Sequence, residues 1–175
     1  MTKSALGFTL VELLVVIAII GTLLVVLLPQ LNRFNNEQVL KNTAAELRSN
    51  IKKTQNNASS GLNCNNTGAA ASQWKINFTK NAGIYAISAT CAKGEPSTSR
   101  SELFPSGIKI NDIQIDDVSY TSASIIFDNI SSAINFTKES GSLLPNADTI
   151  KIFLKDSNVV GIGSTVVLEK GGTVY

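Results

Sequence analysis

Glu12 stands alone as a charge inside a long apolar run near the start of the chain. From Phe8 to Leu28 every other residue is apolar, Gly or Thr. As a helix rising about 1.5 Å per residue, this run is long enough to cross a bilayer. A carboxylate without a partner costs roughly 2.5 kcal/mol or more in a membrane. The sequence therefore predicts that something compensates the charge of Glu12.

The boundary in front of the apolar run also has chemistry. A secretory signal would carry a small-residue cleavage site after its apolar segment, and no A-x-A pattern follows Leu28. The small residue stands before the run instead, at Gly7. A cut between Gly7 and Phe8 would remove a polar leader, residues 1–7, and leave the apolar helix on the mature chain.

The stretch from Gly7 to Glu12, GFTLVE, resembles the processing site of the type IV prepilin family, which includes the type II secretion pseudopilins. The resemblance implies that a membrane prepilin peptidase cuts after Gly7 and N-methylates Phe8. It places the family's glutamate on Glu12 and its helix-kinking proline on Pro29. In that family the glutamate meets the amino terminus of a neighbouring subunit, so Phe8, Glu12 and Pro29 are expected to act in assembly. The alternative is a plain membrane anchor, over residues 8–28, that tolerates one polar residue.

An amphipathic pattern continues the helix over residues 29–60. Its apolar residues recur mostly at spacings of three and four, as on a helix that buries one face. They are Leu31, Phe34, Val39, Leu40, Ala44, Leu47, Ile51 and Ala58. Pro29 should kink or loosen the helix. We expect a helix of about 50 residues, half in the membrane and half packed on a domain.

Residues 61–175 alternate as strands do and predict a β-rich head. Strands are expected at 74–78, 84–90, 108–115, 123–128, 133–137, 149–154 and 165–169, with a short last strand ending at Tyr175. Residues 93–107 are interpreted as a loop, and a phase slip predicts a turn or bulge near Asn111 and Asp112. The fold class is α+β: a long N-terminal helix packed on an antiparallel sheet. Residues 47–56 and several strands are similar to H-type pseudopilins and FimT-like minor pilins.

Cys64 and Cys91 are the two cysteines of the chain. Outside the cytoplasm two thiols readily pair, and closing this loop would stabilise the fold by about 3 kcal/mol. Two unpaired thiols are the alternative.

Four aspartates could offer oxygen ligands to Ca²⁺, but they do not match an EF-hand and are interpreted as polar strand ends. They are Asp112, Asp116, Asp117 and Asp128. We expect neither a metal site nor a cofactor.

Composition argues against an enzyme and gives little support to a nucleic-acid binder. The chain has no His, which is the commonest general base, and its net charge is only +2. Arg48, Lys52 and Lys53 form the one dense basic patch, interpreted as a solvated helix face. Residues 169–175 contain no Arg. DNA binding is allowed by the resemblance, but these residues do not support it.

Two functions from different classes follow. The first is a structural subunit, a minor pilin or pseudopilin, of a type IV pilus or a type II secretion pseudopilus. Its implied partners are other pilin subunits, the prepilin peptidase and an inner-membrane assembly platform. The resemblance implies a single pass through the inner membrane, with the leader cytoplasmic and the head outside. The second is a binding module at a filament tip that recognises DNA, a secreted substrate or a surface.

Overall fold

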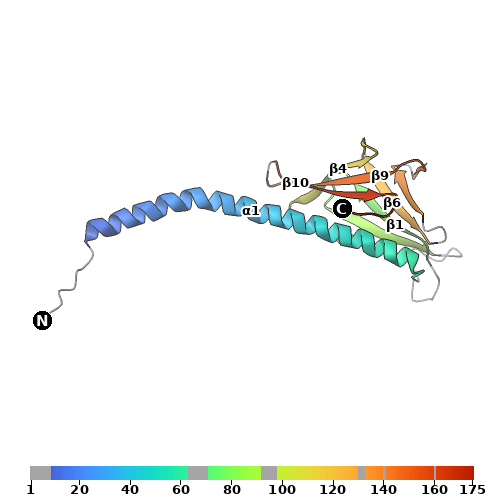
Figure 1. Ribbon diagram of the computed structural model, residues 1–175, viewed down its shortest axis with the longest axis horizontal. Coiled ribbons are helices and arrows are strands. Elements are labelled where there is room, and N and C mark those ends of the chain that lie inside the picture. Colours follow the sequence, from blue (N-terminus) through green and yellow to red (C-terminus); the bar gives the residue numbers. More distant parts are fainter. Residues whose placement is uncertain (1–8, 63–70, 92–97, 130–132, 140, 160) are drawn as a thin grey trace. The chain divides into compact units, whose positions relative to one another are not determined.

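The computed structural model describes residues 9–62, 71–91, 98–129, 133–139, 141–159 and 161–175, without the side chains of 26–29 and Thr98. The chain divides into two compact units, Met1–Glu37 and Gln38–Tyr175, which are described separately. One helix, α1, runs from Leu10 to Ser59 and contributes to both units (Figure 1). Its helical conformation continues through position 29.

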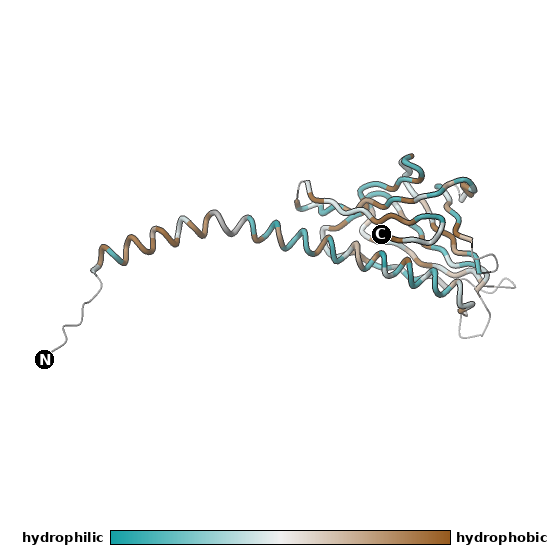
Figure 2. Tube along the Cα trace, viewed as in Figure 1, coloured by the Kyte–Doolittle hydropathy of each residue, from teal (hydrophilic) through white to brown (hydrophobic). Residues whose placement is uncertain are grey.

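The first unit contains the apolar part of α1, and the described residues of the chain do not cover its side chains from Thr9 to Val25. Every described side chain from Thr9 to Val25 is exposed. Figure 2 shows this part of the helix as almost continuously hydrophobic. The hydroxyl of Thr22 donates to the carbonyl oxygen of Ile19 at 2.8 Å, so this polar group is satisfied by the helix itself. An apolar surface that no part of the chain covers calls for lipid or a partner.

The second unit contains residues 38–59 of α1, and here the helix buries one face. The buried apolar side chains lie at helical spacing and are Leu40, Ala44, Leu47, Ile51 and Ala58. The expected stripe was too long at its N-terminal end, because Leu31, Phe34 and Val39 are 57%, 58% and 42% exposed. Helical periodicity alone does not say where the covering domain begins.

The described part of the head forms two antiparallel sheets. The larger, in the order β3-β2-β1-β6-β7-β8, comprises β1 (Ala71–Thr79), β2 (Ile84–Cys91), β3 (Thr98–Leu103), β6 (Ser122–Asp128), β7 (Ile134–Lys138) and β8 (Leu143–Leu144). The smaller, in the order β10-β9-β4-β5, comprises β4 (Ile108–Ile115), β5 (Val118–Tyr120), β9 (Thr149–Asp156) and β10 (Gly163–Glu169). Thus the expected α+β class, a long helix packed on antiparallel sheet, is confirmed.

Two local predictions had opposite outcomes. The register of β4 against β9 shifts between Ile110 and Asp112, so the bulge predicted near Asn111 is confirmed. The loop predicted over residues 93–107 is wrong, because β3 lies within it and pairs with β2.

At the C-terminus, Tyr175 and Val167 exchange two backbone hydrogen bonds, at 2.8 and 3.0 Å, which extends pairing along β10.

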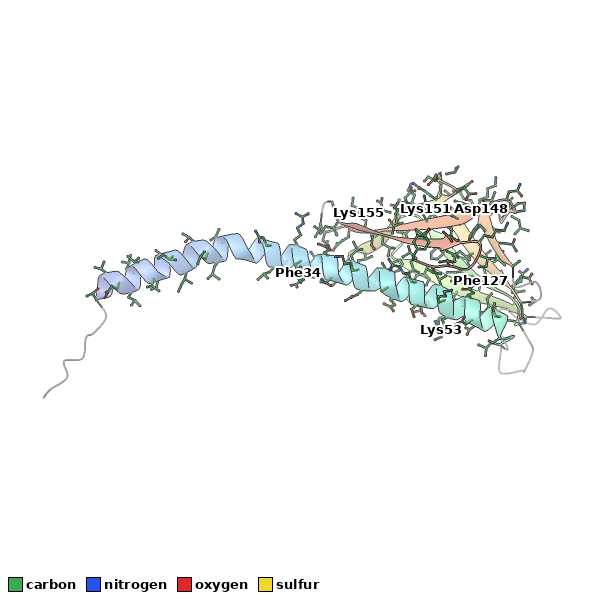
Figure 3. The ribbon with its side chains drawn as sticks, in the orientation of Figure 1. Phe34, Lys53, Phe127, Asp148, Lys151 and Lys155 are labelled. Atoms are coloured by element: carbon green, nitrogen blue, oxygen red, sulfur yellow. The ribbon has the colours of Figure 1, made fainter. Side chains whose placement is uncertain are left out.

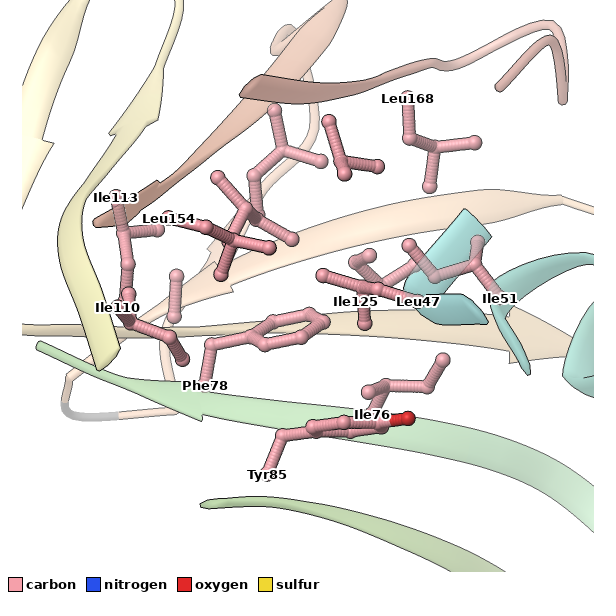
Figure 4. Close-up of a cluster of buried hydrophobic side chains, with 14 of the residues drawn as sticks. Leu47, Ile51, Ile76, Phe78, Tyr85, Ile110, Ile113, Ile125, Leu154 and Leu168 are labelled. Carbon is pink, nitrogen blue, oxygen red and sulfur yellow. The ribbon is translucent and has the colours of Figure 1, made fainter. Parts of the chain in front are cut away.

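A single buried cluster joins α1 residues 38–59 to both sheets. Figure 4 shows Leu47 and Ile51 of α1 near Ile125 of the larger sheet, with Ile110 and Leu154 of the smaller sheet in the same cluster. All five side chains are at most 1% exposed. The second half of the helix is therefore part of the core of the head.

A polar contact also fastens this half of the helix to the C-terminal turn. The Lys52 ammonium donates to the carbonyl oxygen of Gly172 at 2.7 Å. Gly172 has φ +86°, and a Cβ on it would collide with the side-chain amide of Gln55. The positive φ favours glycine at this turn, and any larger residue would also require the Gln55 side chain to shift.

Candidate functional site at the helix N-terminus

Thr9 and Glu12 form a reciprocal cap at the start of α1. The backbone N–H of Thr9 donates to Glu12 Oε2 at 2.9 Å, and the backbone N–H of Glu12 donates to Thr9 Oγ1 at 3.3 Å. The Thr9 hydroxyl also donates to Glu12 Oε2, at 2.8 Å. This is the capping box expected of the pattern Thr-x-x-Glu, in which two backbone donors at a helix start are satisfied by two side chains.

The cap matters more for this helix than for one in water. The first backbone N–H groups of any helix lack partners within it, and water normally satisfies them. In lipid an unsatisfied N–H costs several kcal/mol. A carboxylate near the positive end of the helix dipole is also favourable. Glu12 thus has a role within its own chain that does not depend on a neighbour.

The sequence prediction gave Glu12 only a partner in another subunit and overlooked the cap. The signal was present, because Thr9 stands three residues before Glu12 at the head of an apolar run. Gly7 and Phe8, the predicted cleavage pair, lie outside the described residues, and the side chain of Pro29 does too. Their roles, and the pairing of Glu12 with a neighbouring Phe8, stay predictions.

The helix that follows the cap is long and apolar enough, by length and composition, to cross a membrane. None of its most apolar stretch is buried by the rest of the chain. Together with the capped start, this gives an apolar helix in which two of the backbone donors at its start are satisfied by side chains.

Cys91 ends β2, is 4% exposed, and is disulfide-bonded. Cys64, with which the sequence analysis paired it, lies outside the described residues. The pairing with Cys64 stays a prediction.

The basic patch interpreted as a solvated helix face is not one surface. Lys52 binds the C-terminal turn through Gly172. Arg48 is only partly exposed, and its Nε is buried with no hydrogen-bond partner among the described residues. Lys52 and Lys53 are both exposed, so the interpretation holds for these two, whereas Arg48 departs from it.

The four aspartates serve the head in separate places. Asp112 accepts hydrogen bonds from Ser119, Lys80 and Gln114, at 2.5, 2.9 and 2.9 Å. Burial acts to raise the pKa of its carboxyl, but these hydrogen bonds and the charge of Lys80 lower that pKa to about 2. These contacts hold the β4–β5 region together.

Asp116 and Asp117 form the tight turn between β4 and β5, with φ of 47° and 66°. Asp116 accepts from the backbone N–H of Thr149 at 2.9 Å, and Asp117 pairs with Lys151 at 2.6 Å. Asp128 is the last residue of β6. Within the described ranges, no group of three or more acidic, Cys or His side chains is arranged to hold a metal ion.

Three comparisons with known proteins bear on this site. A family model described as the prokaryotic N-terminal methylation motif matches residues 2–28. The crystal structure of the type IV minor pilin FimU from Pseudomonas aeruginosa strain PAO1 is similar to 81% of this chain and 90% of that chain, at 14% identity and a TM-score of 0.49. Comparison with curated protein sequences gave no match.

The matched segment contains the predicted cut, the capping box and the apolar run, and it leads directly into the long helix. The chain therefore carries a prokaryotic N-terminal methylation motif at the head of a helix whose second half packs on antiparallel sheets.

Proposed function

We propose that the chain is a structural subunit, a minor pilin or pseudopilin, of a type IV pilus or a type II secretion pseudopilus. The observation that carries the proposal is the methylation motif over residues 2–28, which coincides with an apolar helix that the chain leaves uncovered. A helix of this kind sits in lipid before assembly and among the helices of neighbouring subunits afterwards. Its role is mechanical and needs no reaction in the chain itself.

In this proposal the prepilin peptidase removes residues 1–7 and methylates Phe8. Residues 8–28 then hold the chain in the inner membrane, residues 29–60 continue the helix, and residues 61–175 form the head outside. The disulfide at Cys91 supports this orientation, because disulfides persist in oxidising compartments. An inner-membrane platform would collect such subunits for assembly.

Glu12 would have two partners at once. The Glu12 carboxylate accepts one hydrogen bond from the Thr9 backbone N–H and one from the Thr9 hydroxyl, and both end on Oε2. That leaves Oε1 for the ammonium of a neighbouring Phe8, so the cap and the contact between subunits use different oxygens. Because the cap satisfies backbone donors but does not neutralise the carboxylate, the charge still favours meeting a cation in lipid.

Two substitutions at Glu12 separate these roles. Glu12→Gln keeps a side chain that can complete the capping box but removes the charge. Glu12→Ala removes both. If the charge sets assembly, both variants should be cleaved and inserted normally, yet both should be strongly depleted from filaments. The measurement is quantitative immunoblotting of sheared filaments, beside membrane fractions, from cells that lack the native copy.

The outcomes distinguish the possible roles of the residue. Normal incorporation of Glu12→Gln together with a defect in Glu12→Ala would mean that the cap, and not the charge, is required. Normal incorporation of both would leave only a membrane anchor. Wild-type protein that never reaches a filament would remove the structural-subunit proposal itself.

A further inference from the structure

The outer face of the smaller sheet carries two lysines, Lys109 and Lys155, on neighbouring strands. Lys109 of β4 and Lys155 of β9 are register partners, and both are exposed. Like charges directly opposite each other destabilise a sheet. Lys80 and Lys151 each pair with an aspartate, at 2.9 and 2.6 Å. Within the part of the chain that the structure describes, Lys109 and Lys155 have no such partner.

These two lysines line a pocket of about 220 Å³ that contains no acidic side chain. Its walls are Asn81, Lys109, Ile110, Asn111, Lys155 and Ser157. The turn at Asn81 is fixed, because its backbone N–H donates to the carbonyl oxygen of Ile110 at 2.7 Å. The residues that line this volume include two lysines and two asparagines, and all four side chains can donate hydrogen bonds.

A second pocket, of about 260 Å³, adjoins the first and shares Asn111 and Lys155 with it. Its lining includes Phe153, which is partly exposed, and Gly163, the register partner of Lys155. Because Gly163 has no side chain, the residue directly opposite Lys155 on β10 does not cover it. The aromatic ring of Phe153 thus belongs to the same strand as Lys155, two residues before it (Figure 3 labels Lys155).

We propose that the two pockets form a site for a phosphate monoester that carries a planar or apolar group. The phosphate lies between Lys109 and Lys155, and the attached group lies against Phe153. A phosphate monoester is close to a dianion near neutral pH, so it can neutralise both ammonium groups. A carboxylate carries one negative charge and could neutralise only one of them. The same anion removes the repulsion between the two lysines.

Phenyl phosphate is the probe, because it joins a phosphate to an aromatic ring. It is titrated by calorimetry into the full chain in detergent at low, constant ionic strength. Lys109→Met and Lys155→Met should each weaken binding about tenfold, the loss of one charge-assisted contact. Lys138→Met is the matched control, because Lys138 is exposed on β7 and lines neither pocket, so it should leave binding unchanged.

A second arm tests the position of the ring and the source of the phosphate. Phe153→Ala should weaken phenyl phosphate about tenfold and leave inorganic phosphate unchanged. Equal losses for both probes would overturn the placement against Phe153. Binding of a single-stranded oligonucleotide without any affinity for phenyl phosphate would overturn the proposal, because it would indicate an extended polyanion surface.

Folding of the variants is checked independently. Lys109→Met combined with Lys155→Met removes the like-charge repulsion, so without phosphate the midpoint of thermal unfolding should be unchanged or higher. A double variant that folds this well and still binds phenyl phosphate with wild-type affinity would overturn the proposal. Stronger binding of benzoate than of phenyl phosphate by the wild type would do the same.

Discussion

The two halves of α1 show how one helix can serve two environments. Leu14, in the first unit, is 61% exposed, whereas Leu47, in the second unit, is not exposed at all. Both are leucines in the same continuous helix. Among the described residues, none covers the apolar first half, whereas the second half is part of the core of the head.

The two halves differ in exposure because polar side chains are distributed differently around them. Residues 38–59 carry polar side chains opposite the buried stripe, as a helix at a domain surface does. The first half is apolar on all sides, which is typical of a span or of a helix inside a bundle. Contacts within the chain therefore fix the second half, while lipid or other subunits must receive the first.

The largest effect is expected from a substitution at the predicted cleavage site in front of the apolar half. Gly7→Val should block cleavage completely, because a branched side chain should not fit where the peptidase accepts Gly. N-terminal mass spectrometry should then find the leader retained, whereas wild-type protein should start at Phe8. Gly21→Val is the control, since it adds the same side chain to open space within the run and should leave cleavage intact. A mature chain starting after Leu28 would contradict the family assignment.

The comparison of the two halves is tested directly by a matched pair of truncations. Leu47→Ala should lower the free energy of unfolding of the head by about 3 kcal/mol, because it leaves a cavity in a packed core. Leu14→Ala should change it by less than about 0.5 kcal/mol in detergent. Denaturant titration followed by the fluorescence of Trp74, the single tryptophan, measures both. Equal effects would mean that the first half also packs within the chain.

A smaller effect is expected where the C-terminal turn meets the second half of the helix. Gly172→Ala should lower the free energy of unfolding by about 1–2 kcal/mol, because φ is positive there and the new Cβ would meet Gln55. Gly171→Ala is its neighbour and control, with open space around its Cβ position, and should be close to neutral. If the pair behaved alike, the helix would not be held by this turn.

The smallest effect is expected in the smaller sheet, away from α1. Because the pKa of Asp112 is lowered to about 2, its ionised form stabilises the fold above about pH 4, and this stabilisation disappears as the pH falls toward 2. Asp112→Asn should therefore be about 1 kcal/mol less stable at neutral pH, a value reduced by solvent screening, and the difference should shrink as the pH falls through 2. Urea titrations across that range, at low and high salt, measure the difference. A gap that does not change with pH would assign the loss to packing.

The sequence was informative where hydrophobic periodicity is strong. The slip between Ile110 and Ile113 predicted the bulge, because side chains on a strand must return to the buried face. β3 was missed for the opposite reason, since residues Thr98–Leu103 read TSRSEL and show no apolar alternation. It is an edge strand, where polar residues are common and pairing comes from the backbone.

The candidate site was predicted in part. The motif and the apolar run could be found from residue types alone. The cap between Thr9 and Glu12 was missed, because the prediction considered the charge of Glu12 and not its hydrogen bonds. The contact of Lys52 with Gly172 joins residues far apart in the chain and has no local signal. The register that places Lys109 opposite Lys155 likewise depends on strand pairing, which spacing along the chain does not reveal.

The position of the cap has a consequence for maturation. The first helical hydrogen bond of α1 runs from the Leu13 N–H to the Thr9 carbonyl, and the cap itself begins at Thr9. A cut between Gly7 and Phe8 therefore falls outside the hydrogen-bonded helix and breaks none of these bonds. Precursor and mature forms would then share the hydrogen bonds at the start of this helix. An assembly machine that admits only processed chains would have to recognise the chemistry of the new amino terminus, because the fold behind it is the same before and after the cut.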